Sequence, residues 1–212
     1  MKKLIFQLSE FEYLKVITKN NIDFEKIDFC WDEIEIYFIG QQKLLIGQQA
    51  VGEFFESFIG NLKKVINNKL QLHESITQNL GVMWNEKFQG KLGFIMIKAS
   101  DGKSMYWVGL DYEMWAVFNN INQYVTTWLY NDKDTNIIFE VTPFYKWSVQ
   151  EREPEDLDFV TYEEFMKDYQ RIIQRVIPRE IAIAWLDQAM KAYRSLFDNE
   201  EDFLSACKEF KL

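Results

Sequence analysis

The amino-acid sequence predicts an α+β fold, in which a mostly antiparallel sheet is covered by one central amphipathic helix and two C-terminal helices. Two patterns carry this prediction. Apolar and polar residues alternate from residue 31 onward, as in a half-buried strand, and apolar residues then recur at helical spacing over 49–68. Apolar residues make up 48% and aromatic residues 17% of the 212 positions, so the chain can bury a substantial core.

The chain is expected to form a single domain over residues 1–212. A sheet-rich part spans 1–150, a helical C-terminal part spans 159–212, and an acidic segment at 151–158 joins them. This segment is the clearest break in composition. Glycine and proline are few (9 and 3), which argues against an architecture rich in linkers.

The first fifty residues are predicted to form three strands and one short helix. Leu4 to Leu8 fits a short strand, and Ser9-Glu10-Phe11-Glu12 matches a capping box that predicts a short helix ending near Asn20. The next strand is half-buried, and its inward-facing residues are Ile34, Ile36 and Phe38. A turn at 40–43 leads from it into a third strand over 44–46.

The helix over residues 49–68 is the clearest element. Its apolar face consists of Val51, Phe54, Phe55, Phe58, Ile59, Leu62, Val65 and Ile66. Burying eight such side chains is worth a gross ~12–24 kcal/mol before entropy is subtracted. We therefore interpret this face as core and not as a binding groove.

Residues 70–118 are predicted to form sheet. They include a hairpin between 92–98 and 105–110, with Asp101-Gly102 at its tip. The stretch from 122 to 130 fits either a helix, by the spacing of its apolar residues, or a strand, by its Val-Thr-Thr run; the helix is favoured.

A long strand is predicted from Ile137 to Trp147. Pro143 within it should lie at an edge or a bulge, because proline donates no hydrogen bond to a neighbouring strand. Beyond the acidic segment, Thr161-Tyr162-Glu163-Glu164 is a second capping box, which opens a helix that Pro178 ends or kinks. A final helix then runs to about Phe197.

The net charge of −9 excludes some partners. Residues 151–212 carry 15 acidic and 9 basic residues, and every arginine of the chain lies there. Such a chain is a poor binder of nucleic acids and of anionic membranes, because both require clustered lysine and arginine. The two cysteines, Cys30 and Cys207, fit free thiols in a reducing compartment, and no export signal or membrane span is visible, so a cytoplasmic location is expected.

The sequence has no recognisable catalytic, metal or nucleotide motif. His73 is the single histidine, and one histidine with two distant cysteines does not readily form a zinc site. It also has no serine or cysteine partner that would indicate a hydrolase triad. Gly90-Lys91-Leu92-Gly93 lacks the spacing of a phosphate-binding loop. We expect no metal and no cofactor.

Asp111 and Glu113 are the candidate catalytic pair. They stand two residues apart at the end of a predicted strand, which would place both carboxylates on one face, about 6.5–7 Å apart along the chain. Glycosidases use carboxyl pairs near this separation, and Trp107 and Trp115 could stack on sugar rings. The alternative is an ordinary solvated strand end.

The candidate partner-binding residues are the carboxylates of the acidic segment together with Trp147 of the preceding strand. The carboxylates belong to Glu151, Glu153, Glu155, Asp156 and Asp158. Aromatic anchors beside charge give protein interfaces both affinity and steering, so a basic partner is expected. Alternatively, the segment is a solvated linker. A row at four-residue spacing, Lys167, Arg171, Arg175 and Arg179, is interpreted as a solvated helix face, an anion-binding strip or a contact for the acidic segment.

In overall type the chain resembles the immunity proteins of bacterial toxin systems, which are small acidic inhibitors without catalytic residues. The likeness is one of size, charge and the missing catalytic set, and no motif is shared. It implies a non-catalytic protein that binds a basic toxin. A carboxylate-dependent hydrolase using Asp111 and Glu113 is the second hypothesis, and a structural or assembly subunit is the third.

Overall fold

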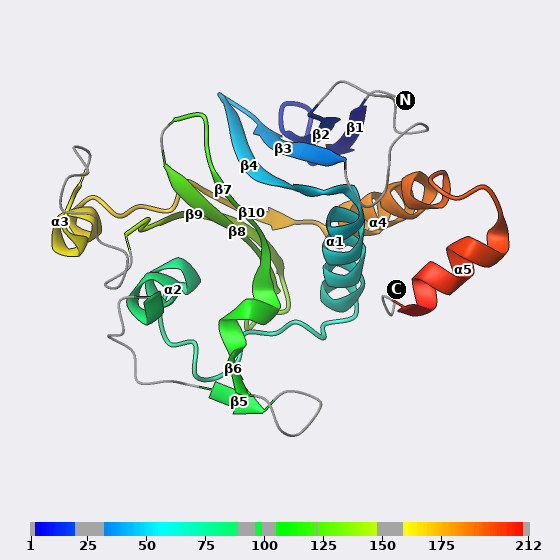
Figure 1. Cartoon of the computed structure of the whole chain (residues 1–212). Helices are drawn as coiled ribbons and strands as arrows, with labels where there is room; N and C mark the ends of the chain where they lie inside the picture. The colour runs from blue at the N-terminus through cyan, green and yellow to red at the C-terminus, as the bar shows by residue number, and fades with distance from the viewer. Residues whose placement is uncertain are drawn as a thin grey trace.

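The computed structural model describes residues 3–19, 32–88, 96–98, 105–121, 123–147 and 159–209. It has an α+β fold, so the predicted fold class is confirmed (Figure 1). The predicted sheet is divided into two four-stranded antiparallel sheets. No helix in the described ranges has the length and apolar content that crossing a bilayer requires.

The first sheet contains β1 (Lys3–Gln7), β2 (Tyr13–Thr18), β3 (Glu33–Ile39) and β4 (Lys43–Ala50), in sequence order. The alternation predicted for the third of these strands is confirmed, because Ile34, Ile36 and Phe38 are buried while the residues between them are not. The strand predicted at the N-terminus is also confirmed as β1.

The short helix predicted after Ser9 is wrong, because that region forms β2. Ser9 does accept a hydrogen bond from the backbone N–H of Glu12 through its hydroxyl (3.2 Å), as a capping residue would. The bond closes the turn between β1 and β2 instead. Leu14, Val16 and Thr18 are buried at a period of two, and this apolar face fixes the segment as a strand.

The second sheet has the order β10–β9–β8–β7, with bounds Ile173–Ile177, Ile137–Phe144, Tyr124–Asn131 and Glu113–Phe118. The helix favoured over 122–130 is therefore wrong. β8 is buried on both faces, between α1 (Val51–Ile66) and α2 (Leu80–Phe88), so it lacks the polar alternation of a half-exposed strand (Figure 1).

The region predicted as sheet over 70–118 is only partly sheet. β5 (Met96–Lys98) pairs with β6 (Met105–Trp107), which confirms the antiparallel hairpin, while its Asp101-Gly102 tip lies outside the described residues. The sequence prediction missed α2 and the 3-10 turn η2 (Val108–Tyr112).

Pro143 lies within β9 where that strand is locally an edge. β10 pairs with β9 only as far as Val141. Beyond that point a side chain of α2 replaces the neighbouring strand: Asn85 donates to the carbonyl of Pro143 (3.0 Å) and accepts from the N–H of Tyr145 (2.6 Å). The edge position expected for this proline is confirmed.

The C-terminal part contains α3 (Tyr162–Lys167), β10, α4 (Arg179–Arg194) and α5 (Glu200–Glu209). The capping box at Thr161 is confirmed, since Thr161 and Glu164 hydrogen-bond each other reciprocally. The helix predicted to continue to Pro178 is wrong, because it ends at Lys167 and β10 follows. Ile173 and Ile177 are buried against β9, and this pairing overrides the helical spacing.

Within the core, α1 and α4 pack against each other and against the sheets. Phe54 and Phe58 of α1 contact the rings of Phe6, Trp115 and Trp185, which come from β1, β7 and α4. α4 also covers the outer edge of β1: Trp185 donates to the carbonyl of Gln7 (2.7 Å) and Gln188 to that of Ile5 (2.8 Å). Such cover keeps an edge strand from pairing with other chains.

Glu12 and Arg175 join the two sheets. The Arg175 guanidinium donates three hydrogen bonds to the Glu12 carboxylate (2.6–3.1 Å), linking β10 to the β1–β2 turn. These bonds lower the pKa of Glu12, against a smaller opposing effect of burial. The stability that the carboxylate contributes is therefore present at neutral pH and is lost as the pH falls through the lowered pKa.

We expect Glu12→Gln to reduce the free energy of unfolding at neutral pH by about 0.5–1 kcal/mol, because the pair is partly solvated. This difference between variant and wild type should become smaller at acidic pH, where Glu12 of the wild type is protonated and has lost its charge as well. Denaturant unfolding at neutral and acidic pH measures it, with Glu10→Gln as the control, since it removes the same charge from the same turn. A loss independent of pH would show that charge pairing is not the cause.

Candidate functional site

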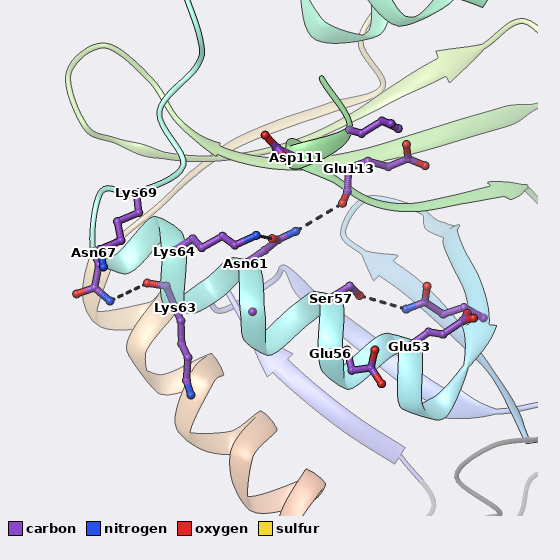
Figure 2. A pocket seen from close by; sticks show the side chains of 13 residues that line it. Glu53, Glu56, Ser57, Asn61, Lys63, Lys64, Asn67, Lys69, Asp111 and Glu113 are labelled. Carbon is purple, nitrogen blue, oxygen red and sulfur yellow. Dashed lines mark hydrogen bonds between the residues drawn. The ribbon is translucent and has the colours of Figure 1, made fainter. Parts of the chain in front are cut away.

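A pocket of 740 Å³ contains both members of the candidate catalytic pair (Figure 2). It lies between the outward face of α1 and the turn η2. Asp111 and Glu113 line it together with Glu53 and Glu56 near the start of α1, and with Lys63 and Lys64 near its end. Asp111 and Glu113, which the sequence paired, therefore line one pocket. The face of α1 opposite them was not predicted.

Asp111 and Glu113 do not stand on one strand face. Asp111 belongs to the 3-10 turn, and Glu113 is the first residue of β7. Figure 2 shows their carboxylates pointing away from each other, while the main-chain oxygen of Glu113 faces α1 and accepts a hydrogen bond from Asn61 (3.5 Å). The two carboxyl groups of a glycosidase flank one scissile bond, and the carboxylates of Asp111 and Glu113 do not have this arrangement.

The charge that acts on Glu113 comes from α2. Burial raises the pKa of the Glu113 carboxyl, and the positive charge of Lys87 partly opposes this. Burial likewise lowers the pKa of Lys87, whose ammonium lies 4.9 Å from the ring centre of Trp84 and 5.4 Å from that of Trp107. Glu113 is thus a largely buried carboxyl group, and the nearby positive charge that acts on it belongs to a lysine lying over two aromatic rings.

We expect the stability of the protein, relative to a Glu113→Gln variant, to fall as the pH rises from about 4, near the ordinary pKa of glutamate, through the raised pKa of Glu113 in the folded protein. The folded protein binds the Glu113 proton more tightly than the unfolded chain, so ionisation costs more in the folded state. Thermal unfolding across this range measures the effect. The exposed Glu53→Gln in the same pocket is the control, and an equal slope for both variants would contradict the assignment.

A second hollow, which we call the aromatic groove, has a volume of 520 Å³ at one end of the second sheet. The residues that define it are Phe118, Tyr124, Tyr145, Trp147, Val160 and Phe165. Trp147 is the sequence-predicted member. Its ring packs on Tyr145 (5.4 Å between ring centres) and on Phe159 (5.5 Å), so it is held in place by neighbouring aromatic rings.

Large apolar side chains of the aromatic groove are exposed. Phe118 is 47% exposed, Tyr124 38% and Val160 42%, and the rings of the first two lie 4.8 Å apart. Exposed apolar groups that gather in one hollow, and are not scattered singly, are typical of interaction sites. Sequence reasoning missed these residues. A phenylalanine and a tyrosine flanking a polar turn between two strands are the signal that could have found them.

The acidic segment, with Glu151, Glu153, Glu155, Asp156 and Asp158, lies outside the described residues. The residues that precede and follow it are in contact with each other beside the aromatic groove. Trp147 packs on Phe159, and the Tyr145 hydroxyl donates to the carbonyl of Val160 (2.7 Å). The described residues on the two sides of the acidic segment therefore lie next to each other, beside the aromatic groove.

The predicted row of basic side chains does not exist as one face. Lys167 belongs to α3, Arg175 to β10 and Arg179 to α4, because the helix expected to carry them ends early. Arg171 lies between α3 and β10 and lines a separate pocket.

The described residues contain no group of His, Cys, Asp and Glu suited to a metal ion. His73 closes a turn, with its Nδ1 2.7 Å from the Ser75 hydroxyl, and Cys207 is a free thiol whose pKa burial raises. Cys30 lies outside the described residues.

No protein-family model matches the chain, and neither do curated proteins or solved structures.

Proposed function

We propose that this chain binds another protein, of basic charge, and that the aromatic groove is the contact surface. The supporting observation is the gathering of exposed Phe118, Tyr124 and Val160 around the anchored ring of Trp147. Tyrosine, tryptophan and phenylalanine are enriched at protein interfaces because each buries a large area at a small cost in side-chain entropy.

The charge of the partner follows from the charge of this chain. The net charge is −9, and five carboxylates stand between Trp147 and Phe159, whose rings are in contact next to the groove. Negative charge near an apolar contact surface attracts a positively charged partner and speeds its association. An inhibitor of the immunity type, which blocks a basic toxin by covering it, is the form of this function that we favour.

The two parts of the proposed surface should affect different rate constants. Replacing Glu153, Glu155, Asp156 and Asp158 by Gln and Asn should slow association and flatten its salt dependence, because exposed charges act mainly on encounter. The double variant Phe118→Ser/Tyr124→Ser should instead speed dissociation, because it removes buried contact area. Stopped-flow binding to a purified partner at two salt concentrations measures both.

Phe11→Ser is the matched control, because Phe11 is 75% exposed on the β1–β2 turn and is not among the residues that line the groove. It should leave both rate constants unchanged. An acidic partner, or an association rate indifferent to the four charge substitutions, would remove the acidic segment from the proposal. A dissociation rate equal for the Phe118/Tyr124 variant and the control would remove the groove.

A further inference from the structure

A buried polar network lies between α2 and the second sheet, with Glu140 of β9 at its centre. The Glu140 side chain is 1% exposed, and it accepts hydrogen bonds from the Tyr130 hydroxyl (2.7 Å) and from the Asn79 amide (2.7 Å). Both of its oxygens therefore act as acceptors. Among the described residues no cation lies within ion-pair distance of it, and a buried charge without a counter-ion is costly.

A pocket of 650 Å³ opens above this network. Its wall includes Asn79, Tyr130 and Tyr169, and Arg171 stands at its exposed rim. The Arg171 guanidinium forms no ion pair with any described residue, yet its charge acts on both Tyr130 and Tyr169. The pocket therefore has a negative charge behind its floor and a positive charge at its rim.

The phenol groups of the floor are oriented as hydrogen-bond acceptors. The Tyr130 hydroxyl donates its proton to Glu140, and the Tyr169 hydroxyl donates to the Asn79 oxygen (3.1 Å). Each phenol has a single proton to donate, and that proton is already used. A ligand in the pocket can therefore only donate a hydrogen bond to the lone pairs of the two phenol oxygens. Burial raises the pKa of Tyr130, and the charge of Glu140 raises it further, so the phenol stays protonated and keeps this orientation.

We propose that this pocket binds a small zwitterion, with its ammonium group against the hydroxyls of Tyr130 and Tyr169 and its anionic group on Arg171. The ammonium donates hydrogen bonds to the phenol oxygens of Tyr130 and Tyr169, which can only accept. It also brings a positive charge close to Glu140, which has no cationic partner among the described residues. The anionic group takes the guanidinium at the rim, where paired hydrogen bonds to a carboxylate are strong. This site is independent of the aromatic groove.

The test uses ω-amino acids of increasing length, from glycine to 6-aminohexanoate, titrated into the full-length protein and followed by amide chemical shifts. One length should bind saturably and shift amides around Asn79, Tyr130 and Tyr169. The alkylamine and the carboxylate of the same length should each bind more weakly, on the order of tenfold, because each lacks one charge-assisted contact.

Two variants separate the two ends of the ligand. Arg171→Gln, at the surface, should weaken the zwitterion to the level of the alkylamine and leave the alkylamine unchanged. Tyr169→Phe should weaken both. Arg179→Gln, at the exposed start of α4, removes an arginine outside the pocket and should change nothing. Shifts that do not saturate with any probe, shifts that map elsewhere, or an Arg171→Gln protein that binds the zwitterion as wild type does would overturn the proposal.

Discussion

Replacing Phe58 by alanine is expected to lower the free energy of unfolding by about 3–5 kcal/mol. The Phe58 side chain is 1% exposed, and its ring contacts those of Phe6, Trp115 and Trp185 at 4.9–6.0 Å. It therefore connects α1 with β1, β7 and α4. Since a whole domain is typically stable by ~5–15 kcal/mol, the soluble yield should fall sharply. Urea unfolding measures the change.

Phe11→Ala is the control for this truncation. It removes the same group from a side chain that is 75% exposed, so the free energy of unfolding should change little. An unchanged melting temperature for Phe58→Ala would mean that the apolar face of α1 is not the centre of the core.

Replacing Gly81 by alanine is expected to destabilise the protein by about 1–3 kcal/mol. In an ordinary helix the same change stabilises by up to ~1 kcal/mol, so the sign of the change in the free energy of unfolding tests the close packing of α2. Gly81 lies in the first turn of α2, pressed against the second sheet. A Cβ there would stand 2.6 Å from the Cβ of Thr142 and closer still to the hydroxyl oxygen of Tyr169. Neither neighbour can move away easily, because the Tyr169 hydroxyl donates to Asn79 and the Thr142 hydroxyl accepts from the buried Trp128 ring.

Gly60→Ala is the matched control, in the middle of α1. Gly60 lines the open pocket beside that helix, so a methyl group enters free space and stability should stay level or rise. Gly81→Ala as stable as wild type would show that α2 is not packed as closely on the sheet as described.

The elements that the sequence predicted correctly are those with one buried face. β3 and α1 each show the period of their structure, because each has a polar side. The capping box at Thr161 was also predictable, since its hydrogen bonds involve residues only three apart.

The elements that the sequence predicted wrongly depend on partners distant in the chain. β8 is buried on both faces, so its pattern carries no period of two. β10 has helical spacing by coincidence and becomes a strand because β9 offers it an edge. The capping-box pattern at Ser9 correctly indicates a hydrogen bond to the Ser9 hydroxyl, but such a bond can close a turn between strands as well as begin a helix.

The candidate sites follow the same rule. Trp147 was found because the composition changes next to it. Asp111 and Glu113 were found by their spacing, yet the 3-10 turn between β6 and β7 sends their carboxylates apart. Phe118 and Val160 meet only through the packing of β7, β9 and α3, which no local pattern records.

The most direct measurement of the central proposal is site-specific photo-crosslinking with a purified basic partner. A photoreactive phenylalanine analogue replaces Tyr124 in the aromatic groove or, as the matched control, Phe11 on the β1–β2 turn. If the groove is the contact surface, the partner crosslinks from position 124 and not from position 11, and added salt lowers the yield. Equal crosslinking from both positions, or crosslinking from position 11 alone, would contradict the proposal.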